Sequence, residues 1–418
     1  MNRFFRSFED MVMHKWLSVV GIGEDGLQGL NPVALALVEQ AKIIVGGKRH
    51  LAMLSPTDNR EKIVWATPIA ATVEKIIAYR GQAVCILASG DPMCYGIGVT
   101  LTRKIPISEM TIIPSPSAFS LACARLGWSL TEVTCLSLCG HPVDIMHLHL
   151  HPNAKLLILS ADKNTPQIVA QLLTKSGFDG SKITVLERMG GIHERITTGE
   201  AREQGAGSRA EIEIADLNTI AVECIADTGI TGLSKLAGLP DSAYEHDGQL
   251  TKQEVRAVTL AALAPKPGEL LWDVGAGCGS ISIEWMRSSS SCSAIAIEQN
   301  PARLQHITNN AASLGVPNLK IISGKAPEAL VDLPIPDVIF IGGGVTTEGL
   351  LETCWQALPL GGRLVANVVT VEGEQKLFTW YQKFGGNFTR IAIQRAEPIG
   401  KFLGWKAMAP VTQWTVTK

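Results

Sequence analysis

The sequence predicts an α/β protein of more than one domain, built on parallel sheets. Three observations support this. A chain of 418 residues exceeds the size of one ordinary hydrophobic core, so two or three domains are expected. Short apolar runs of strand length alternate along the chain with segments of helical periodicity. Many of these runs end in small-residue turns, which are typical of the carboxyl edge of an open parallel sheet.

The composition argues against several classes of function. With 37 basic and 39 acidic residues the net charge is -2, which gives no overall field for nucleic acid or an anionic membrane. The nine cysteines contain no C-x-x-C pair, and their odd number argues against a disulfide framework, so we expect reduced thiols and a cytoplasmic protein. No apolar run reaches the ~18 residues of a membrane span.

The first 15 residues are expected to be a frayed leader. They are charged and interrupted by polar residues, unlike the apolar core of a signal peptide. Met11 and Met13 are possible alternative starts.

The most informative stretch lies between Glu269 and Arg287. Leu270 to Val274 reads as a buried strand, a turn with three glycines follows, and a helical pattern begins at Ser280. Such a turn exposes bare N–H groups to a ligand at the start of a helix. The residues expected to contact a cofactor here are Asp273, Gly275, Ala276, Gly277, Cys278 and Gly279. Tight strand-to-helix packing without a ligand is the simpler alternative.

The next strand strengthens the case for an adenosine site. It runs from Ser293 to Ile297 and ends in Glu298, 19 residues after Gly279. A carboxylate at this place accepts hydrogen bonds from ribose hydroxyls. The glycine spacing departs from the dinucleotide fingerprint because Ser280 stands where that pattern has Gly or Ala. Both dinucleotides and S-adenosyl-L-methionine use such turns.

Further small-residue turns are expected on the same edge of this sheet. They are Gly324 to Ala326, Gly342 to Gly344 and the segment around Gly361 to Asn367. The smooth floor at Gly342 and Gly343 suits a flat macrocycle better than a flipped base. Thr251, with Glu254 three residues later, fits a helix-capping box or a lid over the cofactor. Arg390 to Gln394 and Val411 to Val416 read as a terminal hairpin.

The first half of the chain shows a related but different pattern. Strands at Trp16 to Val20, Ile43 to Val45, Ala83 to Ala88 and Met110 to Ile113 end in turns rich in Gly, Ser and Pro. Asn31 and Pro32 predict a helix start. Ser117 is expected to cap a helix or face a ligand. Further strands are predicted at 156–159, 183–186 and 219–225.

These turns resemble the tetrapyrrole methylase family, in particular its precorrin-6 branch. The matching stretches are Val20-Gly-Ile-Gly-Glu-Asp-Gly26, Gly46-Gly-Lys-Arg-His-Leu51, Ala88-Ser-Gly-Asp-Pro92, Pro114-Ser-Pro-Ser-Ala-Phe-Ser-Leu121, Ser137-Leu-Cys-Gly-His-Pro142 and Leu186-Glu-Arg-Met-Gly-Gly-Ile-His-Glu-Arg195. The resemblance implies a two-lobed fold with S-adenosyl-L-methionine in the cleft. The cofactor contacts that it implies are Gly21, Gly23, Gly90, Asp91, Pro92, Ser117 and Ala118.

The second half resembles the precorrin-specific branch of the Rossmann-like methyltransferases. The matching stretches are Leu271-Trp-Asp-Val-Gly-Ala-Gly-Cys-Gly-Ser280, Phe340-Ile-Gly-Gly-Gly344 and Gly361-Gly-Arg-Leu-Val-Ala-Asn367. The resemblance implies a class I methyltransferase domain with a seven-stranded, mostly parallel sheet. The expected cofactor contacts of this half also include Thr251, Glu298, Gly324, Ala326, Gly342 and Gly343. The fused pair implies methylation of a precorrin macrocycle at carbons 5 and 15 and decarboxylation of the acetate at carbon 12, in cobalamin biosynthesis.

No nucleophile or metal is needed for this chemistry, because electron-rich bridge carbons can attack a sulfonium methyl directly. Arg256, Lys325 and Arg363 are candidates to pair with substrate carboxylates, although each also fits an ordinary surface charge. His141, His147, His149 and His151 lack acidic or cysteine partners at ligand spacing, so no metal site is expected.

The predicted domains are a leader (1–15), a tetrapyrrole methylase domain (16–226), a linker (227–247) and a methyltransferase/decarboxylase domain (248–418). We expect one S-adenosyl-L-methionine per domain, a tetrapyrrole substrate, no nucleic acid or membrane partner, and a homo-oligomer. Two alternatives stay open: an RNA or small-molecule methyltransferase, and a corrinoid-binding scaffold with one inactive half. The scaffold alternative rests on the first turn, because Gly21-Ile-Gly-Glu-Asp-Gly26 departs from the family's usual Gly-x-Gly-Pro-Gly-Asp.

Overall fold

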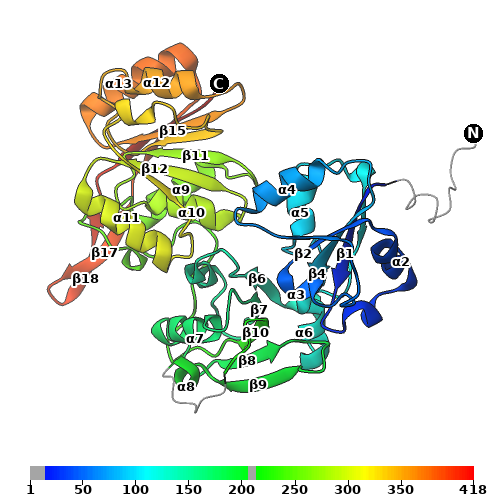
Figure 1. Ribbon diagram of the computed structural model, residues 1–418. Helices are drawn as coiled ribbons and strands as arrows, with labels where there is room; N and C mark the ends of the chain where they lie inside the picture. The colour runs from blue at the N-terminus through cyan, green and yellow to red at the C-terminus, as the bar shows by residue number, and fades with distance from the viewer. Residues whose placement is uncertain (1–14, 206–212) are drawn as a thin grey trace, which may run out of the picture. The chain divides into compact units, whose positions relative to one another are not determined.

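The computed structural model describes residues 15–205 and 213–418, and these form two compact units (Figure 1). The first unit ends at Ile230 and the second begins at Thr231, but the segment Pro142–Leu150 belongs to the second. The predicted leader lies outside the described residues except for Lys15. Among the helices that the structure describes, none combines the length and the apolar character needed to cross a bilayer.

The first unit begins with a five-stranded parallel sheet of order β3-β2-β4-β1-β5. Alternate strand residues pack on opposite faces, Val19 and Ile86 with helices α4 and α5, Val20 and Leu87 with α2. The elements are β1 (Leu17–Ile22), α2 (Pro32–Gln40), β2 (Ile43–Gly46), α3 (Lys48–Leu51), β3 (Glu61–Val64), α4 (Ile69–Ile77), β4 (Val84–Ser89), α5 (Ile97–Thr102) and β5 (Met110–Ile113). As predicted, Asn31 caps α2, its Oδ1 accepting from the Ala34 N–H at 2.9 Å.

A second, mixed sheet of order β6-β7-β10-β8-β9 completes this unit. Its elements are α6 (Ala118–Leu126), β6 (Thr134–Ser137), β7 (Lys155–Leu159), α7 (Thr165–Lys175), β8 (Lys182–Glu187), β9 (Arg195–Glu200), α8 (Ala201–Gly205) and β10 (Asn218–Glu223). The strands β3, β6 and β9 were not predicted from the sequence. All three lie at sheet edges, and the exposed residues of β3 and β9 leave no continuous apolar run to detect.

The absence of a side chain at Gly21 allows the end of β1 to pack closely against the turns that follow β4 and β5. A Cβ on Gly21 would stand 1.9 Å from the Gly90 carbonyl oxygen and 2.6 Å from the Ser115 nitrogen. Both obstacles are backbone atoms, so they cannot rotate away. Gly21→Ala is therefore expected to destabilise the first unit by about 3 kcal/mol, measured by urea unfolding of the full chain.

Gly81→Ala is the matched control for this substitution. Gly81 has φ +90°, but a Cβ added there would meet no atom within 4 Å. The substitution should therefore lower the free energy of unfolding only by the cost of the left-handed backbone conformation, about 1 kcal/mol. Equal destabilisation by the two substitutions would contradict the packing role of Gly21.

The second unit contains a seven-stranded sheet of order β13-β12-β11-β14-β15-β19-β16. Only β19 runs antiparallel to its neighbours β15 and β16, so the sheet is mostly parallel as predicted. Its strands are β11 (Leu270–Val274), β12 (Ser293–Glu298), β13 (Lys320–Ser323), β14 (Val338–Ile341), β15 (Arg363–Val368), β16 (Asn387–Ile391) and β19 (Val411–Thr417).

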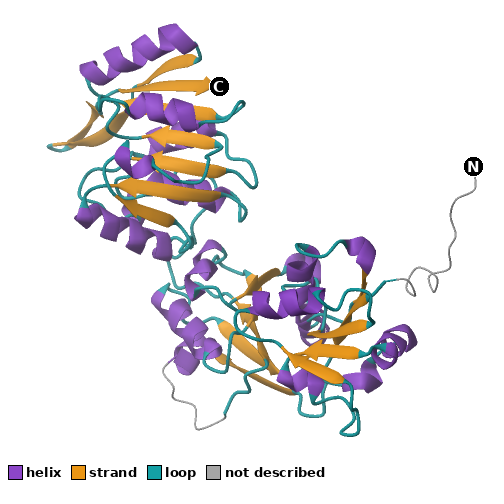
Figure 2. Cartoon of the chain, turned by 45° about the horizontal axis from the view of Figure 1, so that its top comes forward, coloured by secondary structure: helices purple, strands orange, loops and turns teal. Residues whose placement is uncertain are grey.

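Helices cover both faces of this sheet (Figure 2). Leu271 and Phe340 pack with α9, α10 and α11, whereas Trp272 and Ile339 pack with α12 and α13. The helices are α9 (Gln253–Leu263), α10 (Ser280–Ser288), α11 (Pro301–Ser313), α12 (Leu350–Ala357) and α13 (Val371–Phe384). Burial on both faces explains why these strands read as continuous apolar runs rather than alternating ones.

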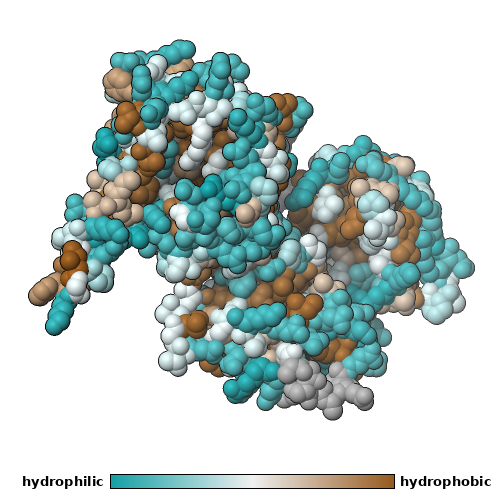
Figure 3. Space-filling view, turned by 90° about the vertical axis from the view of Figure 1, so that its left-hand side faces the viewer, coloured by the Kyte–Doolittle hydropathy of each residue, from teal (hydrophilic) through white to brown (hydrophobic). Residues whose placement is uncertain are grey.

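The two predicted terminal strands do pair, but the prediction that they form a simple hairpin was wrong. β16 does pair with β19, but a separate hairpin of β17 (Gln394–Ile399) and β18 (Phe402–Ala407) lies between them in sequence. This hairpin exposes Ile399, Phe402, Leu403 and Trp405. On the face drawn in Figure 3, hydrophilic residues cover most of the surface and hydrophobic ones gather in separate patches.

The helix start near Thr251 also differs from the prediction. α9 begins at Gln253 with Lys252 at the N-cap, and no side chain makes a capping bond. Glu254 is instead bound by Arg395, with Nη2 to Oε2 at 2.6 Å. The capping box is absent because the helix begins one residue later than the box requires, which leaves Thr251 outside the N-cap position.

Candidate active sites

The first unit contains a cavity of about 390 Å³ between its two sheets. The first sheet contributes the ends of β1 and β4, and the start of α6 adds Ser117 and Ala118. The second sheet contributes residues around Leu159, Leu186 and Asn218. The cavity therefore lies where the resemblance to two-lobed methylases implied a cleft.

Most of the predicted cofactor contacts of this half line the cavity. They are Gly23, Gly90, Asp91, Ser117 and Ala118. Gly90, with φ +52°, allows a sharp turn directly after β4. The structure does not bring Gly21 and Pro92 into the lining: Gly21 serves packing, and the Pro92 carbonyl lies against Gly96 and Gly98. Ser117 caps α6, since its Oγ accepts from the Ser120 N–H at 3.1 Å.

A polar cluster in this cavity was not predicted. Arg49 forms an ion pair with Glu24, and its Nη2 donates to His50 Nε2 at 2.7 Å and to Ser89 Oγ at 2.9 Å. Because a guanidinium only donates, His50 Nε2 acts as acceptor and its proton is assigned to Nδ1. The only sequence signal was Lys48-Arg49-His50 directly after a strand.

His50 is held neutral by its surroundings. Burial, with a further contribution from the charge of Arg49, lowers the pKa of His50 from 6.5 to about 4. The folded state therefore binds fewer protons than the unfolded state between these two values. We expect His50 to contribute stability that is complete above pH 6.5 and is lost as the pH falls towards 4, by up to about 3 kcal/mol.

This pH dependence is tested with His50→Gln, which cannot titrate. Urea unfolding of both proteins from pH 7 to pH 4 should show a smaller acid destabilisation in the variant. If the difference between the two proteins does not change with pH, His50 is not held neutral.

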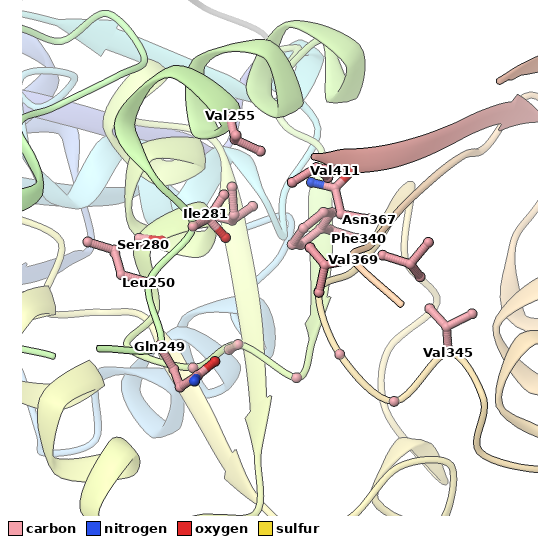
Figure 4. A pocket seen from close by; sticks show the side chains of 18 of the residues that line it. Gln249, Leu250, Val255, Ser280, Ile281, Phe340, Val345, Asn367, Val369 and Val411 are labelled. Carbon is pink, nitrogen blue, oxygen red and sulfur yellow. The ribbon is translucent and has the colours of Figure 1, made fainter. Parts of the chain in front are cut away.

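The second unit contains a larger cavity of about 980 Å³ at the carboxyl ends of its parallel strands (Figure 4). The lining includes these predicted contacts: Thr251, Gly275, Ala276, Gly277, Cys278, Glu298, Gly324, Ala326, Gly342 and Gly343. Asp273 and Gly279 do not line it. The predicted turns thus meet on one edge of the sheet, as parallel strands require.

The three glycines after β11 have different roles. A Cβ on Gly275 would stand 3.0 Å from the Gly343 nitrogen, and one on Gly279 would stand 3.0 Å from Ile307 Cγ2. Gly277, with φ +61°, would bring only the Gln249 carbonyl within 4 Å, at 3.4 Å. Gly275 and Gly279 thus allow close packing, whereas Gly277 presents bare backbone to the cavity.

Glu298 stands at the end of β12, beside this turn. Its Oε2 accepts from the Gly277 N–H at 2.9 Å, and its Oε1 accepts from Gln299 and Asn300, each at 2.9 Å. These bonds fix the carboxylate at the cavity wall. Free lone pairs remain for hydroxyl donors of a ribose.

Asp273 lies beneath the turn rather than in the cavity wall. Its Oδ2 accepts from the Ser282 N–H at 3.0 Å, while its buried Oδ1 has no partner among the described residues. Burial raises the pKa of Asp273 to about 6, although the bonds from Ser282 oppose this rise. Asp273 therefore supports the turn from below, whereas the bare Gly277 turn and the fixed Glu298 carboxylate face the cavity and fit a bound nucleoside with donor groups.

Two of the three catalytic candidates are corrected by the structure. Arg256 is fully buried, and its Nε lies 2.5 Å from Glu284 Oε1. Arg363 begins β15 at the opposite edge of the sheet, where it pairs with Glu269 at 2.6 Å. Neither is available to a substrate in the cavity. Lys325 does line the cavity.

Metal ligation has no support in the geometry. Within residues 15–205 and 213–418, no group of three or more His, Cys, Asp or Glu is placed to hold a metal ion. His147 lies in the short helical segment Val143–Leu148 of the second unit, and burial lowers its pKa.

The chain matches two family models. Residues 17–204 match the Tetrapyrrole (Corrin/Porphyrin) Methylases, and residues 242–418 match the Precorrin methyltransferase domain. These two matches correspond to the two units and to their separate cavities.

Similar proteins include full-length and half-length relatives. A Sinorhizobium protein named precorrin-6Y C(5,15)-methyltransferase (decarboxylating) is 47% identical over 410 residues, 98% of each chain. A cobalt-precorrin-7 C(5)-methyltransferase of Salmonella typhimurium is 32% identical over 180 residues, 43% of this chain and 88% of that protein. The solved C-terminal domain of the Rhodobacter capsulatus precorrin-6Y C5,15-methyltransferase is 45% identical, covering 44% of this chain and 100% of that one, with a TM-score of 0.43. Because the Sinorhizobium relative matches nearly end to end, the chain belongs to the family of decarboxylating precorrin-6Y C(5,15)-methyltransferases.

Proposed function

We propose that the chain methylates a precorrin-6 macrocycle at carbons 5 and 15 and removes the carboxyl group of the acetate at carbon 12. The first unit would methylate carbon 5, and the second would methylate carbon 15 and decarboxylate. The observation that carries this proposal is the presence of two separate cavities, each lined by bare turns at the ends of parallel strands. Homo-oligomerisation and a cytoplasmic location stay predictions.

S-adenosyl-L-methionine, the methyl donor of tetrapyrrole methylases, supplies an electrophilic sulfonium methyl group when bound. In the second unit Gly277 and Glu298 would hold its nucleoside. In the first unit Gly90, Asp91 and Ala118 would contact it. One such site in each unit is part of the proposal.

The residues of both cavities are suited to positioning rather than to covalent catalysis. A bridge carbon of a reduced tetrapyrrole is itself nucleophilic, so the protein has to align it with the methyl group and exclude water. The apolar part of the larger cavity, with Val255, Ile281, Phe340 and Val411 (Figure 4), provides such a dry surface. In the first unit the hydrogen-bonded side chains of Arg49, His50 and Ser89 provide a fixed polar patch in the cavity wall.

Mass spectrometry of the product tests this function. The full chain is incubated with a precorrin-6 substrate and S-adenosyl-L-methionine, and the product is expected to gain two methyl groups and lose one carboxyl group. Omission of the methyl donor is the control. A product with a single methyl and all its carboxyl groups would refute the assignment of the second unit, and an unchanged macrocycle would refute the proposal.

A further inference from the structure

One wall of the larger cavity is apolar except for the amide of Asn367. This residue lies near the end of β15 and lines the cavity. Figure 4 shows its side chain next to Phe340 and Val411, with Val255 and Val369 nearby. An amide on such a wall is costly unless it has hydrogen-bond partners, and a buried network provides them.

Thr259 and Gln413 hold this amide in one orientation. Thr259, fully buried, donates its hydroxyl proton to the Val255 carbonyl at 2.8 Å. Its lone pairs therefore accept, from Asn367 Nδ2 at 2.8 Å and from Gln413 Nε2 at 3.2 Å. Gln413 Nε2 also donates to Asn367 Oδ1 at 2.9 Å. An Asn367 flipped by 180° would lose both bonds, so the network determines which atom faces which partner.

The fixed amide retains one free donor. Asn367 Nδ2 carries two protons, and only one is used by the described residues. Gly277 lies in the turn after β11 and Glu298 ends β12, whereas β15 lies two strands beyond β11 in the sheet. At about 4.8 Å per strand, Asn367 is roughly 10 Å from the strand that carries the glycine turn. This is the side of the cavity left for the substrate.

We propose that Asn367 donates its second Nδ2 proton to the acetate carboxylate that the enzyme removes, and that the surrounding apolar side chains enclose the departing carbon dioxide. The proposal rests on the proposed function and names the residue that orients its decarboxylation step. Thr259 is a positioning residue in this scheme, because it acts through Asn367 and does not line the cavity.

The chemistry explains why a neutral donor suits this place. The bond between the acetate methylene and its carboxylate carbon breaks, carbon dioxide leaves, and the electron pair enters the conjugated imine system of the macrocycle. A proton from water then adds to the methylene carbon and produces a methyl group. The carboxylate loses its charge during cleavage, so an arginine or lysine would stabilise the starting state more than the transition state. One neutral donor orients the group without that penalty.

Asn367→Leu keeps the approximate size of the side chain but removes the donor. We expect carbon dioxide release from the precorrin-6 substrate to fall by roughly 10- to 100-fold, measured with the full chain. The affinity for S-adenosylhomocysteine is expected to stay within about twofold of that of the unmodified protein, and the urea midpoint of unfolding is expected to fall only slightly. Carbon dioxide release within about twofold of the unmodified rate would overturn the proposal, as would a loss that only parallels weaker S-adenosylhomocysteine binding.

Thr259→Val provides the second test, because it is isosteric and lies outside the cavity. It leaves the Asn367 amide without its fixed acceptor, so a smaller loss of carbon dioxide release, roughly tenfold, is expected with unchanged S-adenosylhomocysteine affinity. Asn309→Leu, on the exposed side of α11, is the matched control and should have no effect. An unmodified chain that never releases carbon dioxide would refute the proposed function itself, whereas a normal rate in both Asn367→Leu and Thr259→Val refutes only this inference.

Discussion

Gly277→Val is expected to reduce the binding of S-adenosylhomocysteine from two equivalents per chain to one. Gly277 has φ +61°, a conformation that costs a residue with a side chain about 1–2 kcal/mol and is particularly poor for a β-branched one. The new side chain would also occupy the cavity over the turn, where the Gly277 N–H meets Glu298. Together these effects should weaken binding at the second site by about 100-fold or more, measured by isothermal titration calorimetry.

Gly268→Val is the control for this experiment. Gly268 has φ +89° and meets nothing within 4 Å, and it precedes β11 at the edge of the sheet away from the cavity. Gly268→Val introduces the same backbone strain but places no side chain in the cavity, so both cofactor sites should be retained. Two equivalents bound by Gly277→Val would exclude this turn as a cofactor site, and one equivalent bound by the unmodified chain would exclude a site in each unit.

Arg256→Ala is expected to destabilise the second unit by about 3–5 kcal/mol. Arg256 is the fully buried partner of Glu284. The same carboxylate also accepts from the Gly238 and Leu239 N–H groups at 2.6 and 3.0 Å and from the Tyr244 hydroxyl at 2.9 Å. Removal of the guanidinium leaves a buried negative charge without its cation, which urea unfolding should detect.

Arg390→Ala is the matched control for a surface ion pair in the same unit. Arg390 pairs with Glu374 at 3.2 Å, and its side chain is 62% exposed. Its loss should cost at most about 1 kcal/mol. If Arg256→Ala kept its stability but lost substrate turnover, the original assignment of Arg256 to the substrate would be restored.

The hydrogen bonds of Glu284 also explain why part of the predicted linker, residues 227–247, packs on the second unit. Leu239 and Tyr244 are buried in the core of the second unit, and Glu284 holds the segment by its backbone. In the sequence this stretch shows only turn-forming residues, because its apolar side chains are too widely spaced to form a periodic pattern. The fixed part of the segment belongs to the second unit.

The sequence by itself determined the elements whose cause is local. The strand Leu270–Val274 and the positive-φ turn at Gly275, Gly277 and Gly279 formed as predicted, because the short strand-forming run and the conformational freedom of glycine lie within those residues. The same holds for Asn31 before Pro32, which caps α2 as predicted. Turns at the ends of parallel strands then had to meet on one edge, and both cavities lie at such edges.

The tertiary structure alone decided which charged and polar side chains face a ligand. Arg256 pairs with a residue 28 positions away, Arg363 with one 94 away, and Asn367 with Thr259 at a distance of 108 residues. In sequence these residues are simply charges or amides, since the identity of a polar group does not specify its partner. Desolvation and hydrogen-bond geometry, which exist only after the chain has packed, determined that Arg256 became a buried ion pair and Asn367 a donor at the cavity.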